Sequence, residues 1–182
     1  MDEASGQILV LTEADGSFRP EDVIKLLVYI DDASLVIGTR TTRQMVEQGA
    51  NMRQVLRWGN VVVAKAFELL WYLSCEPRFT DVGCTYRALS RDTWRRLRPH
   101  VRESGPAFSP EMMAEALVQR IRVIEVPVNY LRRRGGTSKH SASWSKVART
   151  AMTMVRTILR KRIEGFRRAP DPVVAATGEV SG

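Results

Sequence analysis

Two acidic side chains follow an apolar run near the start of the chain. Residues 8–11 (ILVL) precede Glu13 and Asp15, which are separated by one residue, and a Gly-Ser pair comes next. A short apolar run bounded by turn residues is typical of a buried strand, and ligands of α/β proteins bind beyond the carboxyl ends of strands. Carboxylates there suit Mg²⁺ or Mn²⁺, which bind a few carboxylates together with substrate phosphate oxygens. An acidic turn that happens to follow a strand is the alternative.

Alternating strands and helices are predicted to position these acids. Predicted strands cover residues 7–12, 35–37, the end of 80–90 and 121–131, and predicted helices cover 20–30, 54–74, 90–99, 109–119 and 142–166. Ser109, followed by Pro and Glu, is typical of a helix cap. Gly38 is expected to close the second strand, and residues 41–52 and 104–110 are expected to be loops. The alternation predicts an α/β fold with a mixed, mostly parallel sheet and flanking helices.

Positive charge is concentrated in one part of the chain. Residues 1–138 hold 19 Lys and Arg against 17 Asp and Glu, whereas residues 139–168 hold nine against one. The apolar share of 44% in 182 residues is that of one globular domain with a core. The chain is therefore a near-neutral body with one basic segment, which indicates an anionic partner surface.

Cysteine usage and hydropathy exclude several classes of protein. Cys75 and Cys84 have neither CxxC spacing nor a nearby His, so we expect two reduced thiols rather than a zinc site or a disulfide framework. No basic region precedes an apolar stretch at the N-terminus, so no signal peptide is expected. The longest apolar stretch, residues 61–73, is interrupted by Lys65 and Glu68 and is too short and too charged to span a bilayer.

An ordered set of segments indicates a family. EADGS is followed in turn by VIGTR, RWGN, TDVGCTYRALSR, FSPEMM and RVIEVPVNYLRRRGGTSK. This succession, over about residues 7–145, resembles family 2 glycosyltransferases of the GT-A fold, in the branch of dolichyl-phosphate mannose synthases and bacterial polyprenyl-phosphate sugar transferases. The resemblance implies a partial GT-A fold, a UDP- or GDP-linked sugar donor, Mg²⁺ or Mn²⁺, a polyprenyl-phosphate acceptor and transfer with inversion. A family 2 transferase with a saccharide or protein acceptor is the alternative enzyme.

The resemblance also implies site residues. The metal motif falls on Glu13 and Asp15, with Ser17 as a further metal-contacting residue; the family has Asp where this chain has Glu13, so Asp15 is the expected direct ligand. The implied donor or diphosphate-binding residues are Arg40, Arg53, Arg57, Arg87, Ser138 and Lys139, and the implied catalytic residues are Asp81 and Arg133. Arginines and a metal would neutralise the leaving diphosphate, and Asp81 is expected to orient the acceptor more than deprotonate it. Solvated arginines, or an Arg87 paired with Asp81 or Asp92, are the structural alternatives.

We expect three parts: residues 1–140 as a C-terminal portion of a GT-A catalytic domain, 141–168 as a basic amphipathic helix and 169–182 as a disordered tail. Apolar residues of the helix recur at helical spacing with Lys and Arg between them. Such a helix suits an anionic membrane surface at the cytoplasmic face, lying in the interface. A helix packed on its own domain is the alternative, and nucleic acid is not an expected partner.

The metal motif lies unusually close to the N-terminus. Relatives have βα units and the base pocket before it, whereas residues 1–6 (MDEASG) cannot supply them. We therefore expect a fragment, a mis-started reading frame or one part of a split protein, with a missing N-terminal half as a partner. The strand at residues 8–11 would expose an unpaired apolar edge, which predicts self-association. A membrane-associated chain without catalysis is the alternative from another class.

Overall fold

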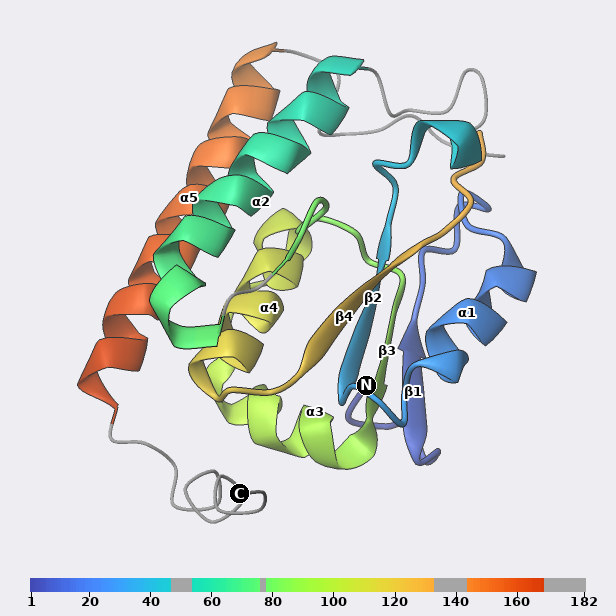
Figure 1. Cartoon of the computed structure of the whole chain (residues 1–182), viewed down its shortest axis with the longest axis horizontal. Helices are drawn as coiled ribbons and strands as arrows, with labels where there is room; N and C mark the ends of the chain where they lie inside the picture. Colours follow the sequence, from blue (N-terminus) through green and yellow to red (C-terminus); the bar gives the residue numbers. More distant parts are fainter. Residues whose placement is uncertain (47–53, 76–77, 133–143, 169–182) are drawn as a thin grey trace.

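A four-stranded sheet forms the centre of the protein, with helices on both faces (Figure 1). The computed structural model describes residues 1–46, 54–75, 78–132 and 144–168. The strands are β1 (Ile8–Leu11), β2 (Leu35–Thr39), β3 (Arg87–Ser90) and β4 (Val123–Pro127), in the spatial order β1-β3-β2-β4. The α/β class and the mixed sheet predicted from the sequence are confirmed.

Strand directions make the sheet mixed. β2 and β4 are parallel, with Leu35 opposite Val123, whereas β3 lies antiparallel to both β1 and β2. β1, β2 and β4 therefore point the same way, and their carboxyl ends lie at one end of the sheet (Figure 1). The expected mostly parallel pairing is wrong, because both pairings of β3 are antiparallel and only β2–β4 is parallel. The four residues of β3, RALS, do not encode the direction of the strand.

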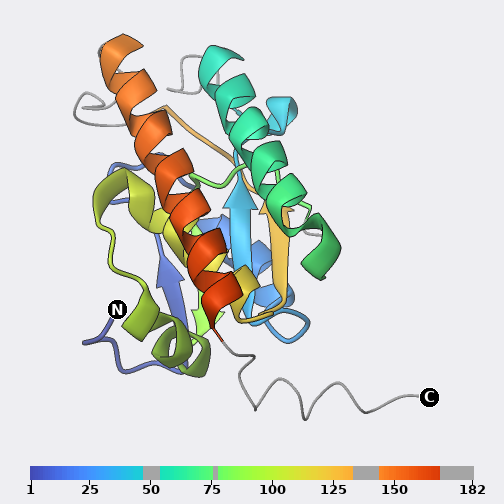
Figure 2. The ribbon, with the colours of Figure 1, turned by 90° about the vertical axis from the view of Figure 1, so that its left-hand side faces the viewer.

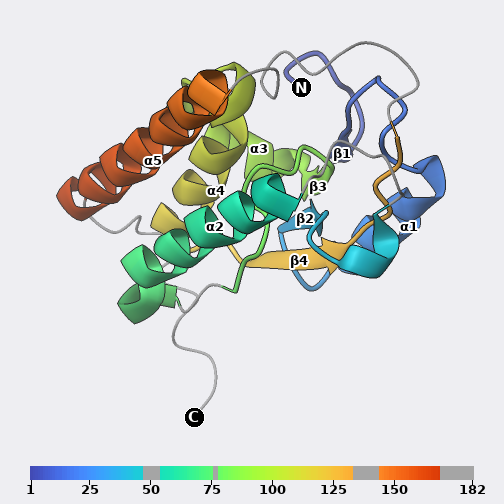
Figure 3. The ribbon, with the colours of Figure 1, turned by 90° about the horizontal axis from the view of Figure 1, so that it is seen from above.

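One face of the sheet is covered by η1 (Pro20–Asp22) and α1 (Val23–Val28), as Figure 3 shows from above. Leu26 of α1 is fully buried against Val36 of β2 and Val126 of β4 in one apolar cluster. Short η2 (Arg43–Met45) lies within the segment expected to be a loop.

The opposite face carries the larger helical layer, which consists of α2 (Gln54–Cys75), α3 (Arg91–Leu97) with η3 (Arg98–His100), η4 (Gly105–Ala107), α4 (Phe108–Val118) and α5 (Trp144–Arg167). Phe67 and Trp71 of α2 stack with ring centroids 4.8 Å apart inside the main core. Helix α4 is buried along residues 109–117, and α2 and α5 lie side by side outside it (Figure 2). No helix in the described ranges is long and apolar enough to cross a membrane.

Three local predictions were wrong for identifiable reasons. Helix α4 begins at Phe108, so Ser109 lies buried inside it and does not cap it. Residues 105–107 form a 3-10 turn instead of a loop. Strand β2 continues through Gly38, where a Cβ would come 2.9 Å from Val128 Cγ2; the glycine permits close packing within the strand and does not end it.

β1 lies at one edge of the sheet and, within the described residues, pairs only with β3. The side chains of Ile8 and Val10 remain 44% and 41% exposed. On the neighbouring helix α1, Ile24 and Val28 are also exposed. The predicted unpaired apolar edge is therefore present.

Candidate functional site

The turn after β1 holds Asp15 in a defined position. Asp15 Oδ1 accepts hydrogen bonds from the Ser17 backbone N at 2.9 Å and from Ser17 Oγ at 2.5 Å. Gly16 between them has φ 74°, a conformation that glycine adopts without strain. Ser17 is fully buried, and its carbonyl accepts from Leu131 N at 2.8 Å. Ser17 therefore orients Asp15, and the expected direct metal contact of Ser17 stays a prediction.

The two acids of the motif differ in their surroundings. Glu13 Oε1 accepts from Thr85 Oγ1 at 2.8 Å, and both acids are partly buried. No cluster of three or more His, Cys, Asp or Glu able to hold a metal occurs in the described part of the chain. These carboxylate oxygens fit a hard divalent cation only as part of its ligand shell, with the phosphate oxygens of a bound diphosphate as further ligands.

A buried ion pair lies at the carboxyl end of β2. Arg40 Nε and Nη2 donate to the two carboxylate oxygens of Asp81 at 2.8 and 2.9 Å, and the Arg40 backbone N donates to Oδ2 at 3.1 Å. The Asp81 side chain is 0% exposed and that of Arg40 is 12% exposed. Burial opposes the charge of Arg40, but Asp81 raises its pKa well above the ordinary value. The pair is a preformed fork with one small opening to solvent.

Residues after β4 connect the Asp15 turn to the ion pair. The Arg40 guanidinium lies 5.4 Å from the centroid of the Tyr130 ring. Tyr130 in turn packs edge-on against Phe18, with centroids 5.5 Å apart, and Phe18 follows the Asp15 turn directly. The sheet thus brings Asp15, Arg40 and Asp81 to one end of the molecule, as sequence reasoning expected of ligand-binding residues.

Sequence reasoning missed Glu125. Glu125 Oε2 accepts hydrogen bonds from the Thr80 backbone N at 2.8 Å and from Thr80 Oγ1 at 2.9 Å. Glu125 Oε1 accepts from the Asp81 backbone N at 2.8 Å. Burial, with the charge of Asp81, raises the pKa of Glu125 to about 7 despite these hydrogen bonds. A signal was available: Glu125 is the one acid inside an otherwise apolar predicted strand.

Arg87 does not face a ligand, and its predicted donor contact is wrong. The guanidinium is 0% exposed and donates to the carbonyl oxygens of Val82, Cys84 and Ser109 at 2.7 to 3.1 Å. Burial lowers its pKa to about 10. Arg87 ties the segment before β3 to α4, and neither of the expected acid partners pairs with it by a described ion pair.

Cys84 is a free, buried thiol, as expected, and burial raises its pKa to about 12.

Five further predicted positions remain predictions. Arg53, Arg133, Ser138 and Lys139 lie outside the described residues, as does the tail 169–182. Arg57 lies on α2, but its side chain is not described.

Comparison with curated proteins identifies sugar transferases that act on lipid phosphates. The chain is 30% identical over 168 residues to an undecaprenyl-phosphate mannosyltransferase of Micrococcus luteus, covering 91% of this chain and 65% of that protein. It is 29% identical over 138 residues to a polyprenol monophosphomannose synthase of Mycolicibacterium smegmatis, covering 75% of this chain and 50% of that protein. The chain thus spans between half and two thirds of the length of these relatives. No protein-family model matches it.

Solved structures show the fold. Glucosyl-3-phosphoglycerate synthase of Mycobacterium tuberculosis, in complex with Mn²⁺ and UDP-glucose, superposes with a TM-score of 0.58 at 13% identity, covering 87% of this chain and 50% of that one. Its complex with Mn²⁺, UDP and glucosyl-3-phosphoglycerate gives a TM-score of 0.56. The GT-A fold and the resemblance to family 2 glycosyltransferases are therefore confirmed, as a partial match.

Proposed function

From a partial GT-A fold similar to glycosyltransferases, we propose that this chain is the catalytic-core and C-terminal portion of an inverting, metal-dependent enzyme. It would move a hexose from a UDP- or GDP-linked donor to a polyprenyl phosphate. The observation that carries this proposal is the placement of Asp15 and the Arg40–Asp81 pair at the same end of the sheet, at the carboxyl ends of β1 and β2. The similarity to polyprenyl-phosphate mannose synthases supports the lipid acceptor.

Each residue has a role in this proposal. Asp15, and Glu13 beside it, would hold Mn²⁺ or Mg²⁺, which when bound neutralises charge that develops on the leaving diphosphate. Arg40 directs Nε and Nη2 to Asp81, and its side chain, 12% exposed, lies at the carboxyl end of β2. Asp81 fixes Arg40 and orients it, because its carboxylate already accepts from Arg40 at both oxygens. An acceptor phosphate is itself anionic near neutral pH, so the transfer needs no strong protein base.

Metal-dependent nucleotide binding tests the site. Calorimetry of UDP and of GDP with the whole chain, with and without Mn²⁺, should detect binding that requires the metal and is lost in Asp15→Ala. Asp92→Ala is the matched control, since Asp92 is an exposed carboxylate on α3 paired only to Arg95 at the surface. Binding that survives Asp15→Ala, or no binding of either nucleotide to folded protein, would overturn the proposed donor site.

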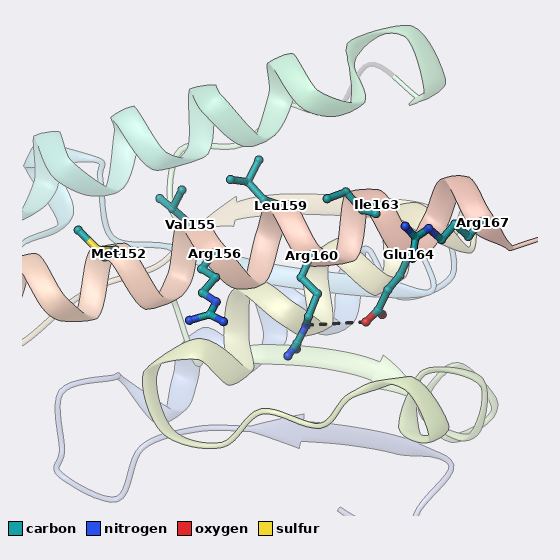
Figure 4. A pocket seen from close by; sticks show the side chains of 8 residues that line it. All are labelled: Met152, Val155, Arg156, Leu159, Arg160, Ile163, Glu164 and Arg167. Atoms are coloured by element: carbon teal, nitrogen blue, oxygen red, sulfur yellow. Dashed lines mark ion pairs between the residues drawn. The ribbon is translucent and has the colours of Figure 1, made fainter.

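The outer face of α5 supports a position on the inner, cytoplasmic surface of a membrane. Its exposed apolar side chains form one stripe, which consists of Met152, Val155, Leu159, Ile163 and Phe166. Val155, Leu159 and Ile163 project from the side of the helix nearest α2, whereas Arg156 and Arg160 project from the opposite side (Figure 4). A helix packed on its own domain with only a basic side in solvent would bury this stripe.

Charged groups share the inner face of α5 with apolar ones, since Ile158 is 3% exposed in the main core and Gly165 packs close to Val118. Lys161 is 1% exposed and lies 3.1 Å from Glu115 and 3.5 Å from Glu111, both on α4. Arg160 adds a contact of 2.8 Å to Glu111. Because ion pairs hold α5 to α4, the apolar stripe is free to face a lipid surface. Exposed Val62, Leu69 and Tyr72 of the adjacent α2 extend the apolar surface.

Vesicle binding tests this position. The chain should co-sediment with vesicles that contain anionic phosphatidylglycerol more than with neutral phosphatidylcholine, because arginines flank the stripe. Leu159→Asp should weaken binding by an order of magnitude or more, since it places a charge in the centre of the stripe. Thr153→Asp is the control, an exposed position on the same helix outside the stripe. Equal binding by the two variants would remove α5 from the proposed membrane surface.

The free edge of β1 favours a second candidate function, that of a chain that acts only with a partner. Ile8 and Val10 at this edge and Ile24 and Val28 on α1 would be covered by a missing N-terminal half or by a second copy. Alone, the chain should self-associate, which light scattering measures. A monodisperse monomer in solution would contradict this candidate.

A further inference from the structure

Glu125 organises the residue that carries the Arg40–Asp81 fork. Its carboxylate binds the backbone N–H of Asp81 and of Thr80, so it fixes the main chain at the position from which the Asp81 side chain extends. Glu125 approaches from β4, Arg40 from β2 and Asp81 from the segment before β3. Asp81 is therefore held from two strands: Arg40 binds its carboxylate, and Glu125 binds its backbone N–H.

A closed ring of hydroxyls adjoins Glu125. Thr39 Oγ1 lies 2.8 Å from Thr41 Oγ1 and 2.8 Å from Thr80 Oγ1, and Thr41 Oγ1 lies 2.7 Å from Thr80 Oγ1. Thr80 Oγ1 also lies 2.9 Å from Glu125 Oε2. Each hydroxyl has one proton to donate. Three protons cannot fill four oxygen–oxygen contacts, so one contact lacks a proton when Glu125 is ionised. A protonated Glu125 supplies the fourth proton by donating to Thr80 Oγ1.

The charged groups around Glu125 affect whether its carboxyl group holds this proton. Asp81 and Arg78 come from the segment before β3, Arg40 from β2 and Arg87 from β3. Lys65 and Glu68 come from α2, and Arg120 and Arg122 come from the turn before β4. Arg40 is committed to Asp81, Arg87 to carbonyl groups, and Lys65 to Glu68 at 2.9 Å. The nearest fixed charge is thus the carboxylate of Asp81, which favours the neutral form of Glu125.

We propose that Glu125 is a positioning residue for the Arg40–Asp81 fork, and that it does so by sharing a proton with the hydroxyls of Thr39, Thr41 and Thr80. With the proton present, all four contacts are filled and Glu125 adds no negative charge beside Asp81. Loss of the proton leaves one contact empty and puts a second negative charge behind Asp81, which loosens the fork. A role of the fork in catalysis rests on the proposed function. The contacts of Glu125 with the threonines and with Asp81, and the proton they share, do not depend on it.

Side-chain NMR on the whole chain tests this without any ligand. The Nε–Hε signal of Arg40, assigned by its loss in Arg40→Lys, should move with pH with a midpoint near 7, the value to which burial raises the pKa of Glu125. In Glu125→Gln the amide mimics the protonated acid, so the signal should stay at its low-pH position at every pH. Glu68→Gln is the matched control, because Glu68 accepts from the neighbouring Phe79 N at 2.5 Å and does not touch Asp81.

Thr80→Val decides where the proton lies. If Glu125 donates to Thr80 Oγ1, loss of that acceptor destabilises the neutral acid, and the midpoint of the carboxyl signal moves to lower pH. If Thr80 only donates to an ionised Glu125, the midpoint moves to higher pH and the shared proton is disproved. An Arg40 signal that is flat through neutral pH in the unmodified chain, or that still titrates in Glu125→Gln, would overturn the positioning role. Either result is independent of whether UDP binds with Mn²⁺.

Discussion

Two buried charge clusters in this molecule are built differently. The Arg40–Asp81 fork lies at the end of the sheet, and the Arg40 side chain is 12% exposed. The cluster between α4 and α5 centres on Lys161, 1% exposed, and on Glu111 and Glu115, both 0% exposed, with Arg160 and Arg168 at its rim. The partly exposed arginine of the fork can contact a ligand, whereas the central ammonium of the helix cluster is enclosed. The first arrangement suits binding, and the second suits attachment of a helix.

The helix cluster also accounts for the placement of α5. Its inner face mixes charged and apolar contacts: Lys161 lies against Glu115, while Ile158, 3% exposed, belongs to the main core. These contacts hold α5 to the domain and leave the apolar stripe exposed. The comparison predicts that breaking the closed cluster costs more free energy of unfolding than breaking the fork.

The largest effect is expected for Lys161→Met. Removing this ammonium takes away the cation that Glu111 and Glu115 share, although Arg160 still pairs with Glu111 and Arg168 with Glu115. The free energy of unfolding should therefore fall by about 3 kcal/mol, the lower end of the cost of breaking a buried pair. Chemical denaturation measures it. Lys65→Met is the matched control, because Lys65 is 55% exposed in its pair with Glu68 and should cost below about 1 kcal/mol. Similar losses in the two variants would show that the α4–α5 cluster does not hold the helix.

A smaller effect is expected for Asp81→Asn. The substitution removes the charge that faces Arg40 but keeps an oxygen that can accept one hydrogen bond, and Arg40 can turn toward solvent. We expect a loss of about 2 kcal/mol in the free energy of unfolding. If the fork serves binding, Mn²⁺-dependent UDP affinity should fall at the same time. A loss as large as that of Lys161→Met would contradict the difference drawn between the clusters.

A third effect concerns pH, to which the two regions should respond in opposite directions. Burial opposes ionisation of Glu115, but hydrogen bonds from Gln119 and Lys161 and nearby cations lower its pKa. Its contribution to stability is therefore present above its unfolded pKa of 4.5 and is lost as pH falls through the lower folded value. The pKa of Glu125 is raised to about 7, so its contribution is present below 4.5 and is lost as pH rises through about 7.

Thermal unfolding across this pH range measures both contributions. Glu115→Gln should reduce the loss of stability in acid, and Glu125→Gln should flatten the fall between pH 4.5 and about 7. Curves for the two variants that differ from the unmodified chain in the same pH window would contradict the assigned shifts.

The sequence predicted local features well where one segment sufficed. The strand at 8–11, the acids after it and the long helices around 54–74 and 142–166 were all predicted close to their observed bounds. Errors arose where a distant segment decided the outcome. Gly38 looked like a strand end because the approach of Val128 cannot be seen in sequence. Arg87 looked like a phosphate ligand because the sequence does not show that α4 closes over it and supplies the carbonyl of Ser109.

By itself, the sequence determined which residue types occur at which spacing: a pair of acids at a strand end, apolar strands, and a basic helix with two faces. Tertiary structure alone decided how those pieces combine. It brought Arg40 to Asp81, 41 residues away, placed Glu125 against the backbone of Asp81, and put Lys161 and Ile158 on the inner side of α5. Periodicity shows that a helix has two faces, but only a neighbour such as α4, with its buried Glu111 and Glu115, determines which face points inward.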